Sequence, residues 1–289
     1  MTAPDEWRLD VLDLDAYLAR IGYDGPRSAT PEVLRAVHLA HIAEIRFENL
    51  DLILGRGVST ELADVQAKFV GARRGGYCYE HGTLLGAVLQ RLGFKVVRML
   101  ARVGPDGAAI RPRSHLALDV TAADGSRWLA DTGFGSGLLE PLPFVAEAPH
   151  RQGGWTFRLH VVPAEDDRWR LQLLERGEWV TQYRFEEVPQ HAVDIEAANW
   201  FTSTNPHSPF LRQPVIARKD GGQVWALRGR ELTIERPDGS KIERTLDDAE
   251  VAAALAEQLG DALDDGEIRA LIATLPARPR IPARRPNRP

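Results

Sequence analysis

Apolar residues recur at helical intervals through the first ninety residues of the chain. The pattern predicts a short helix near 13–21 and a second helix that begins at Thr30-Pro31, with proline in its first turn. The expected buried positions of the second helix are Val33, Leu34, Val37, Leu39, Ile42 and Ile45. A third helix is expected after Ser59-Thr60 and a fourth up to Gly93. The first part of the chain is therefore expected to be mostly helical.

After Gly93 the apolar period changes from helical to alternating, which predicts strands. Strands are expected at 95–103, 115–120, 127–130, 155–162, 168–174, 179–185, 215–217, 223–227, 231–236 and 241–244. The segment 199–210 is rich in Ser, Thr, Asn and Pro, so we expect a loop there. Several short strands in succession indicate an antiparallel sheet or a small barrel.

The end of the chain returns to a helical pattern. Asp247, with Glu250 three residues later, is typical of a helix start. A last helix is expected over about 265–275. The remaining residues, 276–289, are dominated by Pro and Arg, and we expect them to be disordered.

Composition narrows the class of protein. The net charge of −5 gives no basic footprint for nucleic acid. A single cysteine excludes an intramolecular disulfide and fits a reducing compartment. No apolar run approaches the roughly 20 residues that span a bilayer, and the polar, acidic first ten residues lack the pattern of a signal peptide. We expect a cytoplasmic protein that binds neither nucleic acid nor membranes.

The single cysteine, Cys78, follows an Arg-Arg-Gly-Gly run at 73–76 and begins the fourth predicted helix. Unpaired backbone N–H groups and the positive end of the helix dipole favour a thiolate at such a position. The arginines add positive charge nearby. A cysteine can instead be a small buried apolar residue, but this setting favours a reactive thiol.

A reactive thiol needs a base, usually histidine, and a group that orients the base. The segments 114–120 and 127–131 resemble a hairpin closed by 122–125. If Val120 pairs with Ser126, His115 lies opposite Asp131. A one-residue bulge would leave the two diagonal but still close. We therefore expect Asp131 to hold one ring nitrogen of His115 while the other faces the thiol.

His81 is the main alternative base, because it lies three residues after Cys78 on the same predicted helix. Its only neighbouring acid in sequence is Glu80, so we rank it second. His38 and His41 fall within a helix and are expected to be structural.

Five segments together resemble the arylamine N-acetyltransferase family, in the same order and with similar spacing over nearly the whole chain. They are Phe47-Glu48-Asn49-Leu50, 74–80 around Cys78, Ser114-His115-Leu116, 128–135 around Asp131, and 203–210. The resemblance implies an α+β fold with a papain-like cysteine-enzyme arrangement. We expect a helical bundle at 1–94 with the nucleophile, a β-barrel at 95–200 with the histidine and aspartate, an α/β lid at 201–275, and the tail 276–289.

The resemblance also implies roles for residues. Cys78 is the acetyl-accepting nucleophile, His115 the base and Asp131 the orienting acid. The other implied roles are an acceptor pocket of Phe47, Phe134, Phe210 and Val103, donor contacts at Gly133 and Ser114, and an ion pair of Glu48 with Arg74 that supports the cysteine loop. No metal is implied. The donor is acetyl-CoA, the acceptor an aromatic amine or hydrazine, and the protein a monomer or homodimer.

Three positions depart from the common family pattern: Gly82 stands for asparagine, Arg46 for proline and Ser114 for threonine. None removes a catalytic group, so they bear on the acceptor more than on the chemistry. Three alternatives keep the same residues: an amide synthase that closes a macrolactam or another acyl amide, a cysteine hydrolase with water as acceptor, and a non-catalytic binding module.

Overall fold

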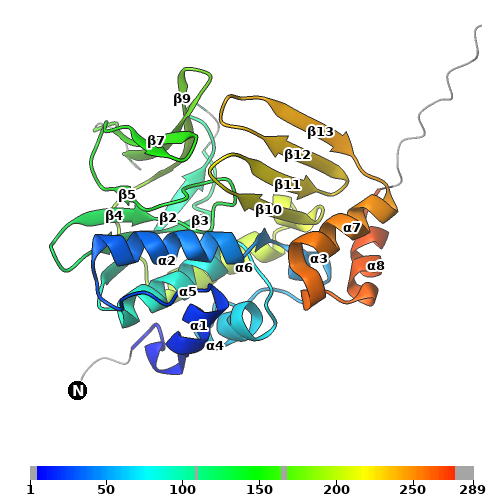
Figure 1. Cartoon of the computed structure of the whole chain (residues 1–289), viewed down its shortest axis with the longest axis horizontal. Coiled ribbons are helices and arrows are strands. Elements are labelled where there is room, and N and C mark those ends of the chain that lie inside the picture. The colour runs from blue at the N-terminus through cyan, green and yellow to red at the C-terminus, as the bar shows by residue number, and fades with distance from the viewer. Residues whose placement is uncertain (1–4, 108–109, 164–167, 277–289) are drawn as a thin grey trace, which may run out of the picture.

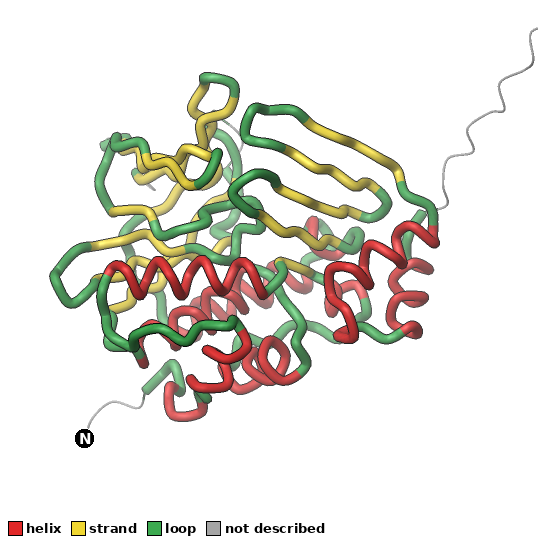
Figure 2. Tube along the Cα trace, in the orientation of Figure 1, coloured by secondary structure: helices red, strands yellow, loops and turns green. Residues whose placement is uncertain are grey.

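The computed structural model of the 289-residue chain describes residues 5–107, 110–163 and 168–276. Helices gather along one side of the molecule and two antiparallel sheets occupy the other (Figures 1 and 2). The predicted disordered tail lies outside the described residues from position 277 onward. None of the helices in the described part of the chain is long and apolar enough to cross a membrane.

The first ninety residues are mostly helical, as predicted. The helices are α1 (Leu14–Arg20), α2 (Pro31–Glu44), α3 (Leu50–Ile53), α4 (Leu62–Gln66) and α5 (Cys78–Arg91), with a 3-10 turn η1 (Leu9–Val11) and a π-helical turn η2 (Ala67–Gly71). Thr30 caps α2 by accepting the Val33 N–H, and Pro31 occupies its first turn. The prediction that Leu39 is buried was wrong. Its side chain is 44% exposed, because α2 buries its 33, 34 and 37 positions and turns Leu39 outward.

An eight-stranded sheet follows in the spatial order β5-β4-β3-β2-β9-β8-β7-β6. Its strands are β2 (Lys95–Val103), β3 (His115–Thr121), β4 (Arg127–Ala130), β5 (Leu142–Pro143), β6 (His150–Gln152), β7 (Trp155–Val161), β8 (Trp169–Glu175) and β9 (Glu178–Phe185). A bridge between Ala146 and Leu159 joins the segment after β5 to β7, so the sheet nearly closes into a barrel. The barrel prediction is confirmed.

The second sheet has the order β1-β10-β11-β12-β13. Its strands are β1 (Phe47–Glu48), β10 (Val215–Lys219), β11 (Val224–Arg228), β12 (Glu231–Glu235) and β13 (Lys241–Thr245). The remaining helical elements are α6 (Ala192–Thr204), η3 (Pro209–Leu211), α7 (Asp248–Leu259), η4 (Gly260–Ala262) and α8 (Asp265–Ala273). Of these, α7 and α8 pack against this sheet. Leu50, Leu227, Leu255 and Leu271 share its apolar core, so the start of α3 packs with the C-terminal helices.

The segment 199–210 is not all loop, because Asn199–Thr204 forms the last turns of α6. The polar side chains that led to the loop prediction form hydrogen bonds in the folded protein. Asn199 donates to the Val58 carbonyl and Thr202 bonds the Tyr79 hydroxyl. Thr204 donates to the Trp200 carbonyl four residues back in the helix. Partners from the cysteine region and from the helix itself therefore offset the weak helical preference of these residues.

The predicted register of the β3–β4 hairpin was wrong by two residues. Val120 pairs with Trp128 rather than Ser126, and Ala122 bonds the Ser126 carbonyl. The loop is thus three residues, 123–125, with Gly125 at φ 85° in the left-handed region that glycine adopts most easily. This register places residue 133, not 131, opposite His115.

Candidate active site

Cys78 is the first residue of α5 and is 3% exposed. The backbone N–H of Tyr77, just before it, donates to the Glu80 carboxylate at 3.0 Å, which caps the helix start. The Cys78 thiol donates to the Ser114 carbonyl at 3.6 Å. The predicted position of Cys78 at a helix start is confirmed. This position places its sulfur beside Ser114, the residue that precedes β3.

His115 and Asp131 lie in contact despite the shifted register. His115 Nε2 is 2.7 Å from Asp131 Oδ2, and both side chains are buried. Burial alone would lower the pKa of His115, but the Asp131 carboxylate outweighs burial and raises that pKa to about 10. Burial acts against ionisation of Asp131 as well, yet the charge on His115 keeps the Asp131 pKa below its usual value.

The Cys78 thiol is a further polar neighbour of the His115 ring and contributes to its raised pKa. Since Asp131 occupies Nε2, Nδ1 is the nitrogen that remains for the thiol. Gly133 packs directly against the backbone of Cys78. A Cβ on Gly133 would lie 2.7 Å from Cys78 Cα and 3.0 Å from its carbonyl oxygen, so only glycine fits without a shift of backbone.

Two further residues hold the pair, and sequence reasoning missed both roles. His38 on α2 accepts the Asp131 N–H through Nε2 and donates from Nδ1 to the Leu139 carbonyl. Tyr183 on β9 packs against the His115 ring with centroids 4.9 Å apart. Its buried hydroxyl lies beside Asp131 without a hydrogen bond of normal geometry. Neither contact leaves a local signal, because each joins distant segments.

His81, the alternative base, is turned away from this chemistry. Its Nε2 faces the carbonyls of Arg46 and Gly76, and its Nδ1 bonds His41. His41 in turn bonds the Tyr17 hydroxyl. Burial lowers the pKa of His81 to about 4, so the ring is neutral and structural.

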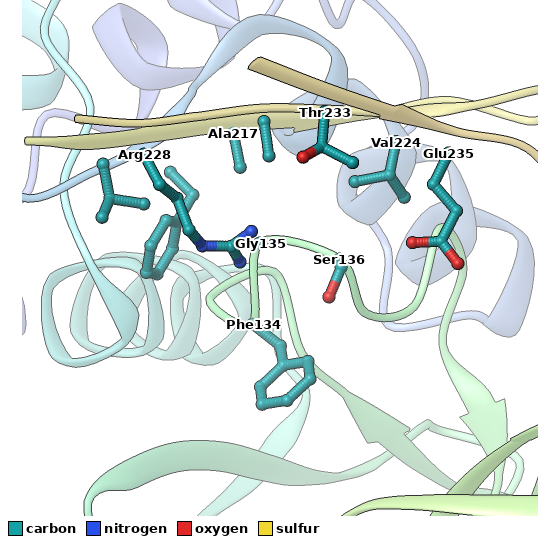
Figure 3. A pocket seen from close by; sticks show the side chains of 11 residues that line it. Phe134, Gly135, Ser136, Ala217, Val224, Arg228, Thr233 and Glu235 are labelled. Carbon is teal, nitrogen blue, oxygen red and sulfur yellow. The ribbon is translucent and has the colours of Figure 1, made fainter. Parts of the chain in front are cut away.

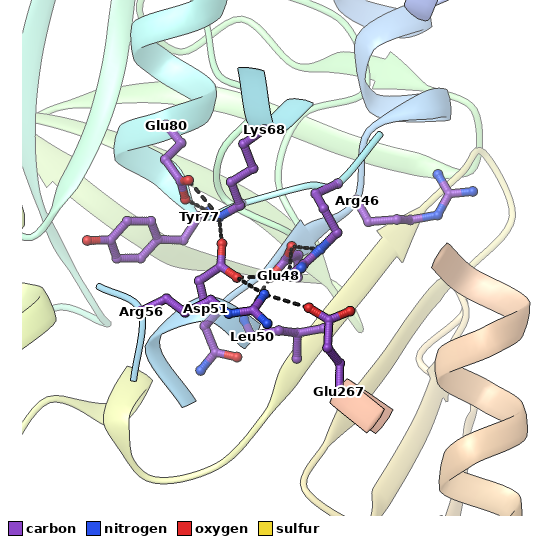
Figure 4. A network of polar contacts seen from close by, with 12 residues as sticks. Arg46, Glu48, Leu50, Asp51, Arg56, Lys68, Tyr77, Glu80 and Glu267 are labelled. Carbon is purple, nitrogen blue, oxygen red and sulfur yellow. Dashed lines mark hydrogen bonds and ion pairs between the residues drawn. The ribbon is translucent and has the colours of Figure 1, made fainter. Parts of the chain in front are cut away.

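The cysteine loop is supported by a buried ion network (Figure 4). Arg74 Nη2 lies 2.8 Å from Glu48 Oε1 and 3.4 Å from Asp51. Lys68 bridges Asp51 and Glu80 at 2.8 and 2.7 Å. The predicted pairing of Glu48 with Arg74 is therefore present, within a larger network that reaches the cap of the cysteine helix.

A cavity of about 720 Å³ opens beside the cysteine. The predicted residues that line it are Cys78, His115, Ser114, Gly133, Phe47, Phe134, Phe210 and Val103. The Phe47 and Phe210 rings lie 6.2 Å apart and tilted. A side chamber of about 120 Å³ shares Phe47, Phe134 and Arg228 with it, and Figure 3 shows Arg228 extending from the second sheet toward Gly135.

The cavity lining also includes residues that sequence reasoning did not assign. Its basic members are Arg111, His207, Arg212 and Arg228, and it contains no Asp or Glu among the described residues. They come from the loop before β3, from the segment around η3 and from β11, so only the folded chain brings them together. Within residues 5–107, 110–163 and 168–276, no group of three or more His, Cys, Asp or Glu side chains is placed to hold a metal ion.

Comparisons with known proteins agree with this geometry. A family model described as N-acetyltransferase matches residues 30–268. The arylamine N-acetyltransferase of Mycolicibacterium smegmatis is 37% identical over 261 residues, covering 88% of this chain and 94% of the relative. The solved structure from Nocardia farcinica matches with a TM-score of 0.88 at 40% identity, covering 94% and 98% of the two chains. That from Mycobacterium abscessus has a TM-score of 0.88 at 37% identity, covering 95% and 98%. The chain belongs to the arylamine N-acetyltransferase family.

Proposed function

We propose that this protein transfers an acetyl group from acetyl-CoA to the nitrogen of arylamines, arylhydrazines or hydrazides, through an acetyl-cysteine at Cys78. The observation that carries the proposal is the contact of His115 with Asp131 beside the Cys78 thiol, at the wall of a 720 Å³ cavity. A thiol, a base and an orienting acid are what a ping-pong acyl transfer requires.

The first step charges the cysteine. With its pKa raised to about 10, His115 is protonated at neutral pH and lies beside the Cys78 sulfur, which reacts as a thiolate. The thiolate attacks the thioester carbonyl of acetyl-CoA, the carbon–sulfur bond to coenzyme A breaks, and His115 gives its proton to the departing thiolate. One thioester replaces another, so the step is close to balanced in free energy.

The second step transfers the acetyl group from Cys78 to the acceptor. The acceptor nitrogen attacks the acetyl carbonyl of Cys78, and His115, neutral after the first step, takes the proton from that nitrogen. The Cys78 thiolate leaves and the amide is released. Conversion of a thioester to an amide makes this step favourable. Asp131 acts in both steps by holding the ring through Nε2 and stabilising its protonated form.

The acceptor is expected to lie among Phe47, Phe134, Phe210 and Val103. These side chains give the cavity an apolar wall that suits a flat aromatic ring. Phe134 also contacts His115 edge to face at 5.1 Å, so a ring against Phe134 would lie close to the base.

The positive charge of the cavity suits binding of the donor, acetyl-CoA. The basic side chains Arg111, Arg212 and Arg228 line the same cavity, which suits the phosphates of coenzyme A. The arylamine N-acetyltransferase of Mycobacterium marinum, 33% identical, has been solved in complex with CoA. Gly133 and Ser114 lie at the cysteine end of the cavity, where we expect the pantetheine arm and its acetyl group.

Mass spectrometry of the intact protein tests the proposal. After incubation with acetyl-CoA alone, we expect a gain of one acetyl group on Cys78, discharged quickly by an aromatic amine and slowly by water. Cys78→Ala should gain nothing. Absence of acetylation would contradict the proposal, rapid discharge by water would favour a hydrolase, and charging only from a carrier-bound acyl chain would favour an amide synthase.

We further propose that the chain divides into units at 1–94, 95–200 and 201–275, that the protein is cytoplasmic, and that it is a monomer or homodimer.

A further inference from the structure

Lys219, the last residue of β10, is a buried cation outside the catalytic residues. It is 4% exposed, and its ammonium donates to the carbonyl oxygens of Ser136 at 2.8 Å and Gly137 at 2.6 Å. The ammonium also lies over the rings of Trp155 and Phe157, 4.3 and 4.5 Å from their centroids. Among the described residues, the hydrogen-bond acceptors of this ammonium are two carbonyls on one loop, and two aromatic rings lie against it.

No carboxylate in the described part of the chain forms an ion pair with this ammonium. Glu235 and Glu175 act on it electrostatically from a longer distance, and Glu235 is paired with Lys241. Burial consequently lowers the pKa of Lys219 to about 7. A buried charge without a counter-ion costs stability, and an apolar residue of similar size would avoid that cost. A lysine at this position is therefore best explained by the contact that its ammonium makes.

The loop that Lys219 holds, residues 131–139, connects the catalytic aspartate to the cavity wall. Phe134 projects from it and contacts His115 edge to face. Gly137 packs directly beside Phe134, since a Cβ at 137 would lie 2.9 Å from Phe134 Cβ. His38 bonds the two ends of the loop, at Asp131 and Leu139, whereas Lys219 bonds its middle.

The same residue stands where the second sheet meets the barrel. Next to it, the Asp220 carbonyl accepts the Trp155 indole N–H at 2.9 Å, and the Gly221 carbonyl accepts the Gly154 N–H at 2.8 Å. A movement of β10 relative to β7 would therefore be passed through Lys219 to the backbone of Ser136 and Gly137.

We propose that Lys219 is a positioning residue for the acceptor pocket, holding the 131–139 loop from the second sheet so that Phe134 keeps its place against His115. Lys219 does not touch the reacting atoms. Its effect is on the fit of the acceptor, whereas the reactivity of Cys78 depends on His115 and Asp131. The inference rests on the proposed acetyl transfer.

The test compares Lys219→Met with the parent protein in the second half-reaction. Methionine keeps the apolar stem against Trp155 and Phe157 but removes the charge and the N–H donors. Protein acetylated beforehand on Cys78 is mixed with increasing 4-anisidine in single-turnover experiments. We expect the amine concentration for half-maximal rate to rise about tenfold, the equivalent of one lost charge-assisted hydrogen bond, with the limiting rate within about threefold of the parent.

Three companion measurements separate this role from a structural one. Alkylation of Cys78 by iodoacetamide should keep its rate and pH profile. Tm at pH 6.5 should be higher, because a buried charge has been removed. Hydrogen exchange of the 132–139 amides should become faster while that of α5 stays the same. Lys219→Arg, which keeps charge and donors, should recover part of the lost amine affinity.

Lys95→Met is the matched control, since Lys95 is exposed at the start of β2. An unchanged concentration dependence in Lys219→Met, or equal losses in limiting rate and thiol alkylation, would overturn the inference. If Lys219→Met does not fold, Lys219→Leu carries the same comparison, because leucine likewise lacks both the charge and the N–H donors. If the parent protein itself takes no acetyl group, the proposed function fails instead.

Discussion

Glycine at position 133 is dictated by the space around Cys78. The new Cβ of an alanine would meet the backbone of Cys78 at 2.7 Å, and backbone cannot move aside as a flexible side chain can. Gly82 is confined differently. A Cβ there would meet the end of the Leu116 side chain at 2.5 Å. The sequence marks both glycines, but only the packed structure shows which neighbour excludes a side chain.

Gly133→Ala should therefore lower kcat/KM by about a hundredfold, as expected for a displacement of roughly 1 Å at the reacting atoms. Steady-state acetylation of an aromatic amine measures the loss. The matched control is Gly71→Ala, where nothing lies within 4 Å of the new Cβ and activity should be preserved. Equal activities of the two variants would contradict the packing argument.

Asp131→Asn tests the charge that acts on His115. The Asp131 carboxylate raises the pKa of His115 to about 10, so its removal should lower that pKa and leave the ring neutral at pH 7. The thiolate then loses its positive partner. We expect alkylation of Cys78 by iodoacetamide at pH 7 to slow. An unchanged alkylation rate would mean that another group activates the Cys78 thiol.

At the scale of elements, predictions from apolar spacing succeed where one face of an element is buried. The extents of β2 and β4 agree with the alternating pattern at both ends. The short elements β1, α3, β5 and β6 were missed, because two to four residues carry no period. The β3–β4 register was wrong for a related reason. A shift of two residues leaves every side chain on the same face of the sheet, so the apolar pattern cannot detect it.

The ion network joins elements whose association no local pattern indicates. Arg56 pairs with Glu267 on α8 and with Asp51 on α3, and Lys68 connects Asp51 to Glu80 on the cysteine helix (Figure 4). The two ends differ in exposure. The Lys68 side chain is 16% exposed and that of Arg56 is 49% exposed. Charge removal should therefore matter more at Lys68 than at Arg56.

Lys68→Met should cost about 3–5 kcal/mol of unfolding free energy, because it leaves the buried Glu80 carboxylate without its cation. Arg56→Met, at the exposed end of the same network, should cost less than about 1 kcal/mol. Urea denaturation followed by circular dichroism gives both values. A loss at Arg56 as large as that at Lys68 would show that the network acts as one cooperative unit.

At the scale of the molecule, the order of helices, barrel and second sheet could be anticipated, and so could the contact of His115 with Asp131. What sequence reasoning could not supply are contacts between segments far apart. His38 reaches Asp131 across 93 positions, and Lys219 reaches Ser136 across 83. From the surrounding sequence alone, His38 looks like an ordinary helix residue and Lys219 like an ordinary strand residue. Their partners are backbone groups, which every residue carries and which therefore leave no mark in the sequence.

His115 and Lys219 are buried groups whose titration should change the free energy of unfolding in opposite directions as pH rises. His115 has a folded pKa of about 10, above its ordinary 6.5, so it binds its proton more tightly in the fold. Its contribution is complete below about 6.5 and is lost as pH rises toward 10. Lys219 has a folded pKa of about 7, below its ordinary 10.5. The unfolded chain keeps that proton longer, so the Lys219 contribution increases with pH between about 7 and 10.5.

Lys219→Met should remove the Lys219 contribution and leave that of His115 in place. Relative to the parent protein, its Tm should be raised at pH 6.5, where the parent carries the buried charge, and this gain should disappear by pH 10, where the folded parent has lost it. Calorimetry of both proteins from pH 6 to 10 measures the difference. A constant difference across that range would mean that Lys219 stays charged in the fold, because its two carbonyls and two rings then compensate for burial.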